Sequence, residues 1–226
     1  MKRILVFSPH FDDESIACGG TIARHAREGD DITIVFMTSG NSGNISHPDI
    51  SQTEYGQIRK AEAAQALRVL GVTKPFECLE LEEGFMRFTP ELEKQLITMI
   101  RCVQPNIIYA PHDQDDHNDH IVTHKAVVQA AYRAKWLSFP HLGTPPHIVS
   151  ELRFYEVWTP LQRPNFYMDI SSTVETKKEA IKCYHSQLIE INYHDASLGL
   201  NRYRGIMKAD VDYAEAFRIE GLIKVE

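Results

Sequence analysis

Cysteines, long apolar runs and runs of like charge are all scarce in this sequence of 226 residues. The apolar segment that follows Lys2 and Arg3 ends at Ser8, which is too short for a signal peptide or a membrane span. The four cysteines are scattered and form no Cys-x-x-Cys pair, so neither a disulfide framework nor a thiolate zinc site is expected. We therefore expect a cytoplasmic protein without a membrane span.

A strong excess of positive charge is also absent. Lys and Arg total 24 against 31 Asp and Glu, which gives a formal charge of −7. Such a chain is a poor match for nucleic acid or an anionic membrane. With 43% hydrophobic and 24% charged residues the composition is that of a globular protein. No repeat or Gly/Ser linker divides the chain, so we predict one domain over residues 1–226.

Apolar strand-like runs alternate with segments of helical periodicity through the first 135 residues. This alternation predicts an α/β fold, with a Rossmann-like, mostly parallel sheet and helices on both faces. The predicted strands are residues 4–7, 32–37, 77–81, 106–110, 152–158 and 167–170. The predicted helices are residues 21–27, 53–70, 90–103, 121–134 and 173–188, the last being the final long helix.

An acidic loop with one histidine follows the first predicted strand. Ligands of open α/β sheets bind outside the carboxyl ends of the strands, and this loop places His10, Asp12, Asp13 and Glu14 there. The loop matches no phosphate-binding glycine motif, and its negative charge suits a divalent cation such as catalytic zinc. The alternative is that Asp12 and Asp13 only cap the next helix while His10 is solvated.

A second cluster, residues 111–120, follows the strand predicted at 106–110 and contains three histidines and four aspartates. Two His/Asp loops at the same sheet edge favour a metal site over two solvated loops. His124 is a rival ligand, because it stands four residues after His120 on a predicted helix. We favour the alternative that His124 is an ordinary histidine on the helix surface.

Two short motifs resemble those of a known family. Residues 9–14, PHFDDE, resemble the PHPDDE motif of the PIG-L/LmbE-like deacetylases, and residues 117–120, HNDH, resemble their HPDH motif. Members of this family are zinc enzymes that remove acetyl from N-acetylglucosamine-type amino sugars. The likeness extends to residues 59–62, 70–72, 177–187 and 214–217. The chain departs from the family at Phe11 and Asn118, which replace prolines, at Glu83, which replaces an Asp, and at Asp115 and Asp116, which enrich the second loop.

The resemblance implies a role for each matching residue. His10, Asp13 and His120 would bind one zinc ion per chain, and Asp12 would remain free as the catalytic base. His117 would stabilise the oxyanion and Asp119 would orient His117, while either Asp12 or His117 would protonate the leaving amine.

The resemblance also implies two residues that contact the substrate. Arg59 would bind its polar groups, the alternative being a helix-surface charge paired with Glu54 or Glu62. His185 would also contact the substrate, the alternative being a core histidine. We expect the loops at residues 41–52 and 139–147 to line the site.

These residues predict a zinc-dependent N-deacetylase whose partner is a small amino-sugar substrate. The alternatives are a metal-dependent amidase acting on a non-sugar N-acyl compound and a non-catalytic sugar-binding α/β protein, which would not need a free Asp12. A serine or thiol hydrolase is not favoured, because neither Ser15 nor Cys18 lies in a nucleophile-elbow motif. The oligomeric state, a homo-oligomer included, stays open.

Overall fold

Apolar runs near the start of the chain form the centre of the sheet. The computed structural model describes residues 1–42, 48–189 and 191–221. In it β1 (Arg3–Ser8) lies between β2 (Asp31–Thr38) and β4 (Ile107–Pro111), and both neighbours run parallel to it. Side chains on both faces of these strands are buried, as is typical of a parallel sheet covered by helices on both sides.

Within the described residues, seven strands join one sheet in the order β3-β2-β1-β4-β5-β7-β6. The strands from β3 to β5 are parallel to their neighbours, whereas β7 runs antiparallel to both β5 and β6. The outer strands are β3 (Glu77–Leu81), β5 (Glu151–Tyr155), β6 (Phe166–Asp169) and β7 (Ala214–Gly221). The predicted fold class, a mostly parallel α/β sheet, is therefore confirmed.

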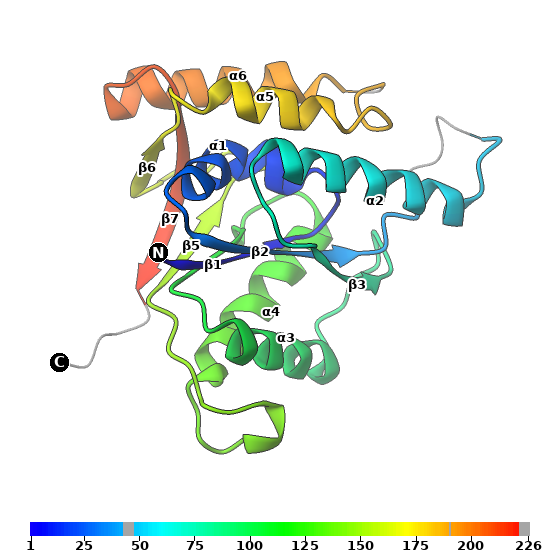
Figure 1. Ribbon diagram of the computed structural model, residues 1–226, viewed down its shortest axis with the longest axis vertical. Helices are drawn as coiled ribbons and strands as arrows, with labels where there is room; N and C mark the ends of the chain where they lie inside the picture. Colours follow the sequence, from blue (N-terminus) through cyan, green and yellow to red (C-terminus); the bar gives the residue numbers. More distant parts are fainter. Residues whose placement is uncertain (43–47, 190, 222–226) are drawn as a thin grey trace.

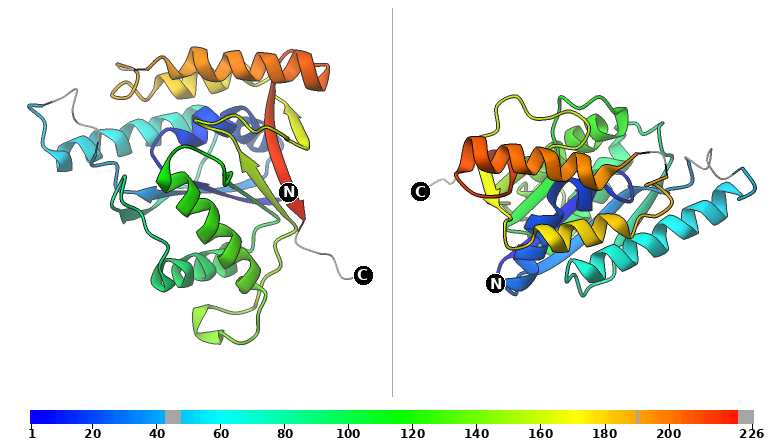
Figure 2. Two further views of the ribbon diagram at one scale, coloured as in Figure 1. Left: turned by 180° about the vertical axis from the view of Figure 1, so that it is seen from behind. Right: turned by 90° about the horizontal axis from the view of Figure 1, so that it is seen from above.

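Helices cover both faces of the sheet, as Figures 1 and 2 show. One face carries α1 (Asp13–Arg27), α2 (Gln52–Val69), α5 (Val174–Lys182) and α6 (Tyr193–Arg204). The other carries α3 (Pro90–Val103) and α4 (Asn118–Ala134). Each layer has its own apolar core against the sheet. Two short segments, η2 (Pro140–Leu142) and η3 (Gly205–Ala209), complete the secondary structure of the described residues.

The C-terminal third departs from the sequence prediction. The helix predicted at 173–188 ends at Lys182, because the chain turns there and returns Tyr184 to α1 and Ser186 to α2. It is not the last long helix, since α6 follows it, and α6, η3 and β7 were not predicted. The strand predicted at 152–158 ends at Tyr155. The helices predicted at 21–27 and 121–134 begin earlier, at Asp13 and Asn118.

A buried ion pair joins this third of the chain to α1. The helix has a break at Cys18, where φ is −137° and ψ is 23°. Just after the break the amides of Gly20 and Thr21 donate to the two carboxylate oxygens of Glu215, at 2.9 and 2.8 Å. Lys177 Nζ donates to the same carboxylate at 2.7 Å, and both side chains are fully buried. The pair therefore fixes the part of α1 that follows the break against β7 and α5.

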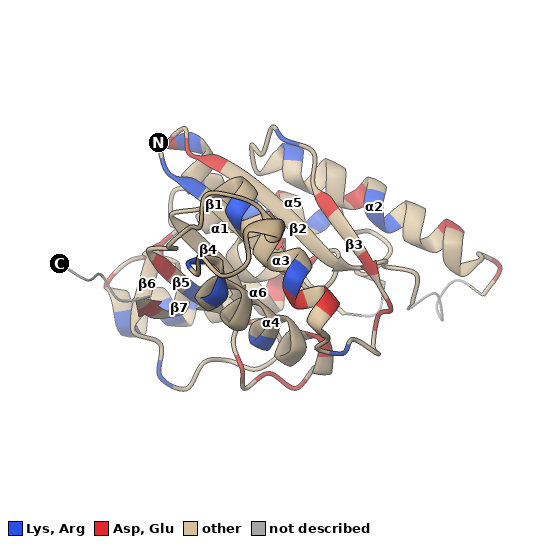
Figure 3. Cartoon of the chain, turned by 90° about the horizontal axis from the view of Figure 1, so that it is seen from below, with Lys and Arg blue, Asp and Glu red and all other residues tan. Residues whose placement is uncertain are grey.

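The charges on the surface are of mixed sign, and the cysteines are not paired. Lys and Arg are interspersed with Asp and Glu on the view from below (Figure 3). All four cysteines lie in the described part of the chain and are free thiols. No helix among the described residues is long and apolar enough to cross a membrane.

Candidate metal centre

The sheet brings the two His/Asp loops together. β1 and β4 are adjacent and parallel, so the loops that follow Ser8 and Pro111 leave the same edge. The first loop presents His10 and leads into α1, whose first residue is Asp13. The second leads into α4, where His120 lies in the first turn. All three of these side chains are buried.

Three atoms from His10, Asp13 and His120 form a nearly equilateral triangle. His10 Nδ1 lies 3.1 Å from Asp13 Oδ2 and 3.3 Å from His120 Nε2, and the third side of the triangle, Asp13 Oδ2 to His120 Nε2, is 3.2 Å. In a tetrahedral zinc site with bonds of about 2.0–2.1 Å, ligand atoms lie about 3.3 Å apart. Two imidazole nitrogens and one carboxylate oxygen are also a donor set that zinc accepts. The residues therefore fit a zinc ion with one position left open.

Asp119 supports His10 from behind. Its Oδ2 lies 3.1 Å from His10 Nε2, the ring nitrogen that faces away from the triangle. The same carboxylate accepts hydrogen bonds from the amides of Gly84 and Met86. A carboxylate on the second ring nitrogen is the usual support of a metal-binding histidine. The Asp119 carboxylate therefore contacts His10, whereas the contact of this residue with His117 is made by its backbone amide.

Asp115 occupies the corresponding position behind His120. Its Oδ1 lies 3.4 Å from His120 Nδ1, which is buried and has no well-directed hydrogen bond among the described residues. Backbone amides of His117, Trp158 and Thr159 donate to the Asp115 carboxylate. The sequence pointed to Asp115 only as an extra acidic residue. Two of these three amides come from the distant loop after β5, so spacing alone could not show its role.

The buried carboxylates control the charge of the two imidazoles. Burial works to lower the pKa of His10, but hydrogen bonds to Asp119 and Asp13 outweigh it and raise the pKa to about 10. Burial is likewise outweighed at His120, where Asp13 and Asp115 raise the pKa to about 9. The pKa of Asp13 is lowered, because the two histidines overcome its burial. The surrounding carboxylates thus favour a positive charge in this pocket.

His117 stands at the edge of the triangle. One ring nitrogen of each of His10, His117 and His120 lies within 4.8 Å of the other two, so His117 is a rival third ligand to Asp13. We favour Asp13, because its oxygen contacts both other ligands directly. His117 Nδ1 accepts the amide N–H of Asp119 at 3.2 Å and caps α4. In the neutral ring the proton is therefore on Nε2, which leaves an N–H donor free.

Asp12 is next to the triangle but outside it. It stands at the N-cap position of α1 without a capping hydrogen bond from its side chain, and its φ is 140°, a conformation that costs a residue other than glycine about 1–3 kcal/mol. The amide of Asp12 donates to Glu14 Oε2 at 3.3 Å, and Tyr184 Oη donates to Glu14 Oε1 at 2.6 Å. Burial raises the pKa of Asp12 well above its usual value, although Arg59 opposes the shift. The strained backbone thus separates two adjacent carboxylates into different environments.

Arg59 is buried beneath the first loop and is not a surface charge. It donates to Glu83 Oε1 at 2.8 Å and to the carbonyl of Phe11 at 2.9 Å, and its Nη2 lies 3.8 Å from Asp12 Oδ2. The alternative of a surface pair with Glu54 or Glu62 is therefore wrong. Glu54 bonds Ser51 in the cap of α2, and Glu62 accepts hydrogen bonds from Ser186. Glu83 also accepts the amide of Ser42.

Two other histidines lie away from the triangle. His185 is exposed in the turns after α5, so the alternative of a core histidine is wrong. His124 is half-buried, with Nδ1 3.0 Å from the carbonyl oxygen of Pro111 and its ring against Phe154. It is therefore absent from the ligand triangle, and it is also less exposed than a surface histidine.

The structure differs for the two loops that were expected to line the site, residues 41–52 and 139–147. The loop at 139–147 follows α4, whose 17 residues start at the metal centre and extend about 25 Å away from it. The expectation that this loop contacts the substrate is therefore wrong. Residues 43–47 of the other loop lie outside the described residues, whereas Ser42 reaches the site through Glu83.

Comparisons with known proteins agree with this geometry. A family model described as PIG-L, GlcNAc-PI de-N-acetylase, matches residues 5–131. The chain is 28% identical over 197 residues to a diacetylchitobiose deacetylase from Thermococcus kodakarensis, covering 84% of this chain and 72% of that protein. The solved structure of N,N'-diacetylchitobiose deacetylase from Pyrococcus horikoshii is 27% identical, with a TM-score of 0.87 over 97% of this chain and 84% of that one.

A third relative shares the fold but carries the name of a different activity. The 4-carboxy-2-hydroxymuconate hydratase GalB from Pseudomonas putida KT2440 is 24% identical, with a TM-score of 0.85 over 100% of this chain and 99% of that one. At this identity the likeness shows the fold alone, so function has to be argued from the site. The family model, by contrast, covers more than half of the chain and includes both His/Asp loops. This chain belongs to the PIG-L family.

Proposed function

We propose that this protein is a zinc-dependent hydrolase that removes the N-acetyl group from an N-acetylglucosamine-type amino sugar or its conjugate. The observation that carries the proposal is the triangle of His10, Asp13 and His120 beside a separate buried carboxylate, Asp12. Family membership and the names of the relatives support the substrate class. The experiment that tests it is the release of acetate from N-acetylated sugars by the zinc-loaded protein.

The residues around the triangle have separate tasks. A zinc ion held by His10, Asp13 and His120 would polarise the amide carbonyl and lower the pKa of a bound water to about 7. Asp12 would take a proton from the attacking water. His117, with its proton on Nε2, would donate a hydrogen bond to the amide oxygen as that atom gains negative charge. Either Asp12 or His117 then returns a proton to the leaving amine.

The non-catalytic alternative explains these features less well. A protein that only bound sugar would need no second buried carboxylate next to the ligand triangle, nor the strained backbone that holds Asp12 apart from Asp13. Strained residues of this kind cluster at functional sites because the surrounding structure maintains them at a cost in stability. The amidase alternative shares the same chemistry and differs only in its substrate.

The first prediction concerns the metal. The purified protein should bind one zinc ion per chain, and chelation should abolish acetate release until zinc is restored. His120→Ala should lose zinc, because it removes one corner of the triangle, whereas the control His124→Ala should keep it. Zinc content by elemental analysis is the measurement. A His120→Ala protein with unchanged stoichiometry and affinity would make His117 the third ligand.

The second prediction separates the two adjacent aspartates. Asp12→Asn should keep zinc and lose turnover by a factor on the order of 10² to 10⁴, which is the usual effect of removing a general base. Asp13→Asn should instead weaken zinc binding, since a neutral amide oxygen is a poorer ligand than a carboxylate. Zinc content and kcat are measured for both isosteric variants. An Asp12→Asn protein that is metal-free, or active with zinc bound, would show that the roles are reversed.

The third prediction concerns the carboxylates behind the ligands. Asp119→Asn and Asp115→Asn should each lower zinc affinity by about 10- to 100-fold, because they support the rings of His10 and His120. Asp116→Asn is the matched control, since Asp116 lies on the same loop and is exposed. Competition with a chromogenic chelator gives the affinities. Equal affinities for all three variants would remove both residues from the metal centre.

The fourth prediction assigns Arg59 as a positioning residue that acts through Asp12. Its Nη1 and Nη2 already contact Glu83 and the Phe11 carbonyl, so we expect Arg59→Lys to lower kcat more than it raises KM, while zinc content is unchanged. Arg59→Ala should lower kcat further, and the partial recovery in the lysine variant separates a charge effect from general destabilisation. A rise in KM at constant kcat would instead show that Arg59 binds the sugar directly.

A further inference from the structure

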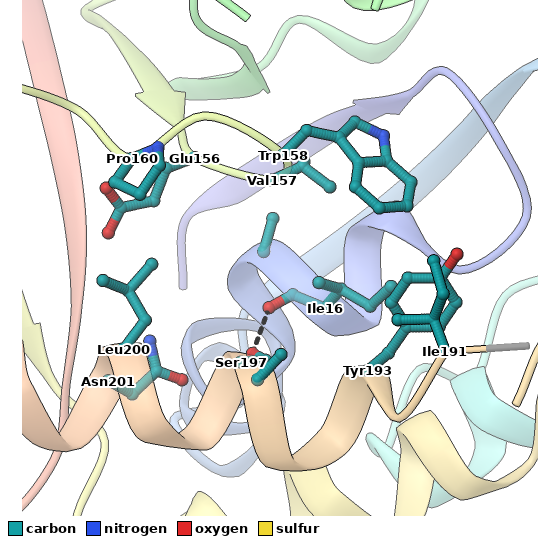
Figure 4. Close-up of a pocket in the computed structure, with 12 residues that line it drawn as sticks. Ile16, Glu156, Val157, Trp158, Pro160, Ile191, Tyr193, Ser197, Leu200 and Asn201 are labelled. Atoms are coloured by element: carbon teal, nitrogen blue, oxygen red, sulfur yellow. Dashed lines mark hydrogen bonds between the residues drawn. The ribbon is translucent and has the colours of Figure 1, made fainter. Parts of the chain in front are cut away.

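A cavity of about 270 Å³ lies between α1, the loop after β5 and α6 (Figure 4). Ile16 and Ala17 line it from α1, Val157 and Trp158 from the loop, and Leu200 from α6. The indole of Trp158 is 41% exposed and meets the ring of Tyr193 edge to face, with centroids 5.5 Å apart. An apolar cavity of about 150 Å³ holds a benzene molecule, so this one has room for an aromatic ring.

The deep polar side chains of the cavity are already paired with the protein. Glu156 accepts hydrogen bonds from Arg204 and from the amide of Leu161. Ser197 Oγ donates to the carbonyl of Ile16, a bond drawn in Figure 4. Asn201 Oδ1 accepts from Lys177 at 2.7 Å. A ligand group in the cavity would therefore meet mainly apolar carbon, which favours an apolar group over a sugar ring with its hydroxyls.

The cavity is tied to the ligand triangle by two routes. Ile16 and Ala17 stand three and four residues after Asp13, so their side chains lie on the same face of α1, about 5–6 Å along the helix. On the other wall, the amide of Trp158 donates to Asp115, the carboxylate behind His120. A substituent on a molecule whose amide carbonyl sat at the triangle would therefore lie within reach of the cavity.

We infer that the substrate is an amino sugar that carries an apolar group, and that this group binds in the cavity between Trp158, Ala17 and Leu200. The inference rests on the proposed deacetylase function and specifies which kind of amino-sugar conjugate is the substrate. The apolar group has two chemical sources, an aryl or alkyl aglycone on the sugar or an N-acyl chain longer than acetyl. Burial of such a group in a fitted pocket changes specificity by roughly 10- to 200-fold.

The test compares matched substrates on a variant whose cavity is filled. Ala196 lines the cavity and is exposed, so Ala196→Phe fills it without disturbing the core. Ala61→Phe is the control, because Ala61 is an exposed helical alanine that does not line the cavity. The kcat/KM ratio is measured for phenyl against methyl glycosides of N-acetylglucosamine, and for N-hexanoyl- against N-acetylglucosamine. Calorimetry with the phenyl glycoside of glucosamine measures binding without turnover.

The wild type and the Ala61→Phe control should prefer one apolar substrate by roughly tenfold or more, and Ala196→Phe should abolish that preference while leaving the methyl glycoside within about twofold. The series that shows the preference identifies the source, aglycone or acyl chain. A wild-type protein with the same kcat/KM for both members of each pair, or a preference that survives Ala196→Phe, would overturn the inference while the proposed function stands.

If no N-acyl sugar is hydrolysed, the proposed function fails, and calorimetry alone decides on the cavity. Weaker binding of the phenyl glycoside to Ala196→Phe than to the wild type then supports the inference, and equal or undetectable binding overturns it.

Discussion

Two buried imidazoles among three buried carboxylates are the constraint on which the rest of the site depends. His10 lies between Asp13 and Asp119, and His120 lies between Asp13 and Asp115. Buried carboxylates are costly unless positive charge or hydrogen bonds compensate them. Protons on the imidazoles provide that charge, as their raised pKa values indicate, and a divalent cation at the triangle would provide it in their place. Because these buried carboxylates need a compensating positive charge, metal binding would also stabilise the folded state.

The sheet and the site edge could be predicted from the sequence because their signals are local. Continuous β-branched runs identified β1, β2 and β4, and each His/Asp loop directly follows one of these strands. Parallel strands release their loops at a common edge, so adjacency of β1 and β4 was enough to bring His10 near His120. The separation of Asp12 from Asp13 came from the family resemblance. Its structural basis, a φ of 140° at Asp12, has no signal in the spacing of the residues.

Other features could not be predicted, because each depends on a partner far away in the chain. Arg59 was expected to contact the substrate, with a helix-surface charge as the alternative, and only the fold shows that it bonds Glu83 and the carbonyl of Phe11. Asp119 belongs to the same short motif as His117, yet its carboxylate contacts His10, which is 109 residues away in the sequence. The antiparallel strand β7 was missed for the same reason, since its role emerges only where Glu215 meets the broken helix α1. Short periodic patterns contain no information about such contacts.

The division of α1 into two parts links these distant contacts to the chemistry. Its first turn carries Asp13 and follows the strained Asp12, while the turn after the break at Cys18 is held by Glu215 and Lys177. The buried ion pair anchors the part of α1 that follows the break. The first turn has a contact of its own, the hydrogen bond from Tyr184 Oη to Glu14. The fold can therefore keep Asp12 in a costly conformation, because packing and hydrogen bonds from α5 and β7 hold the helix on which that conformation depends.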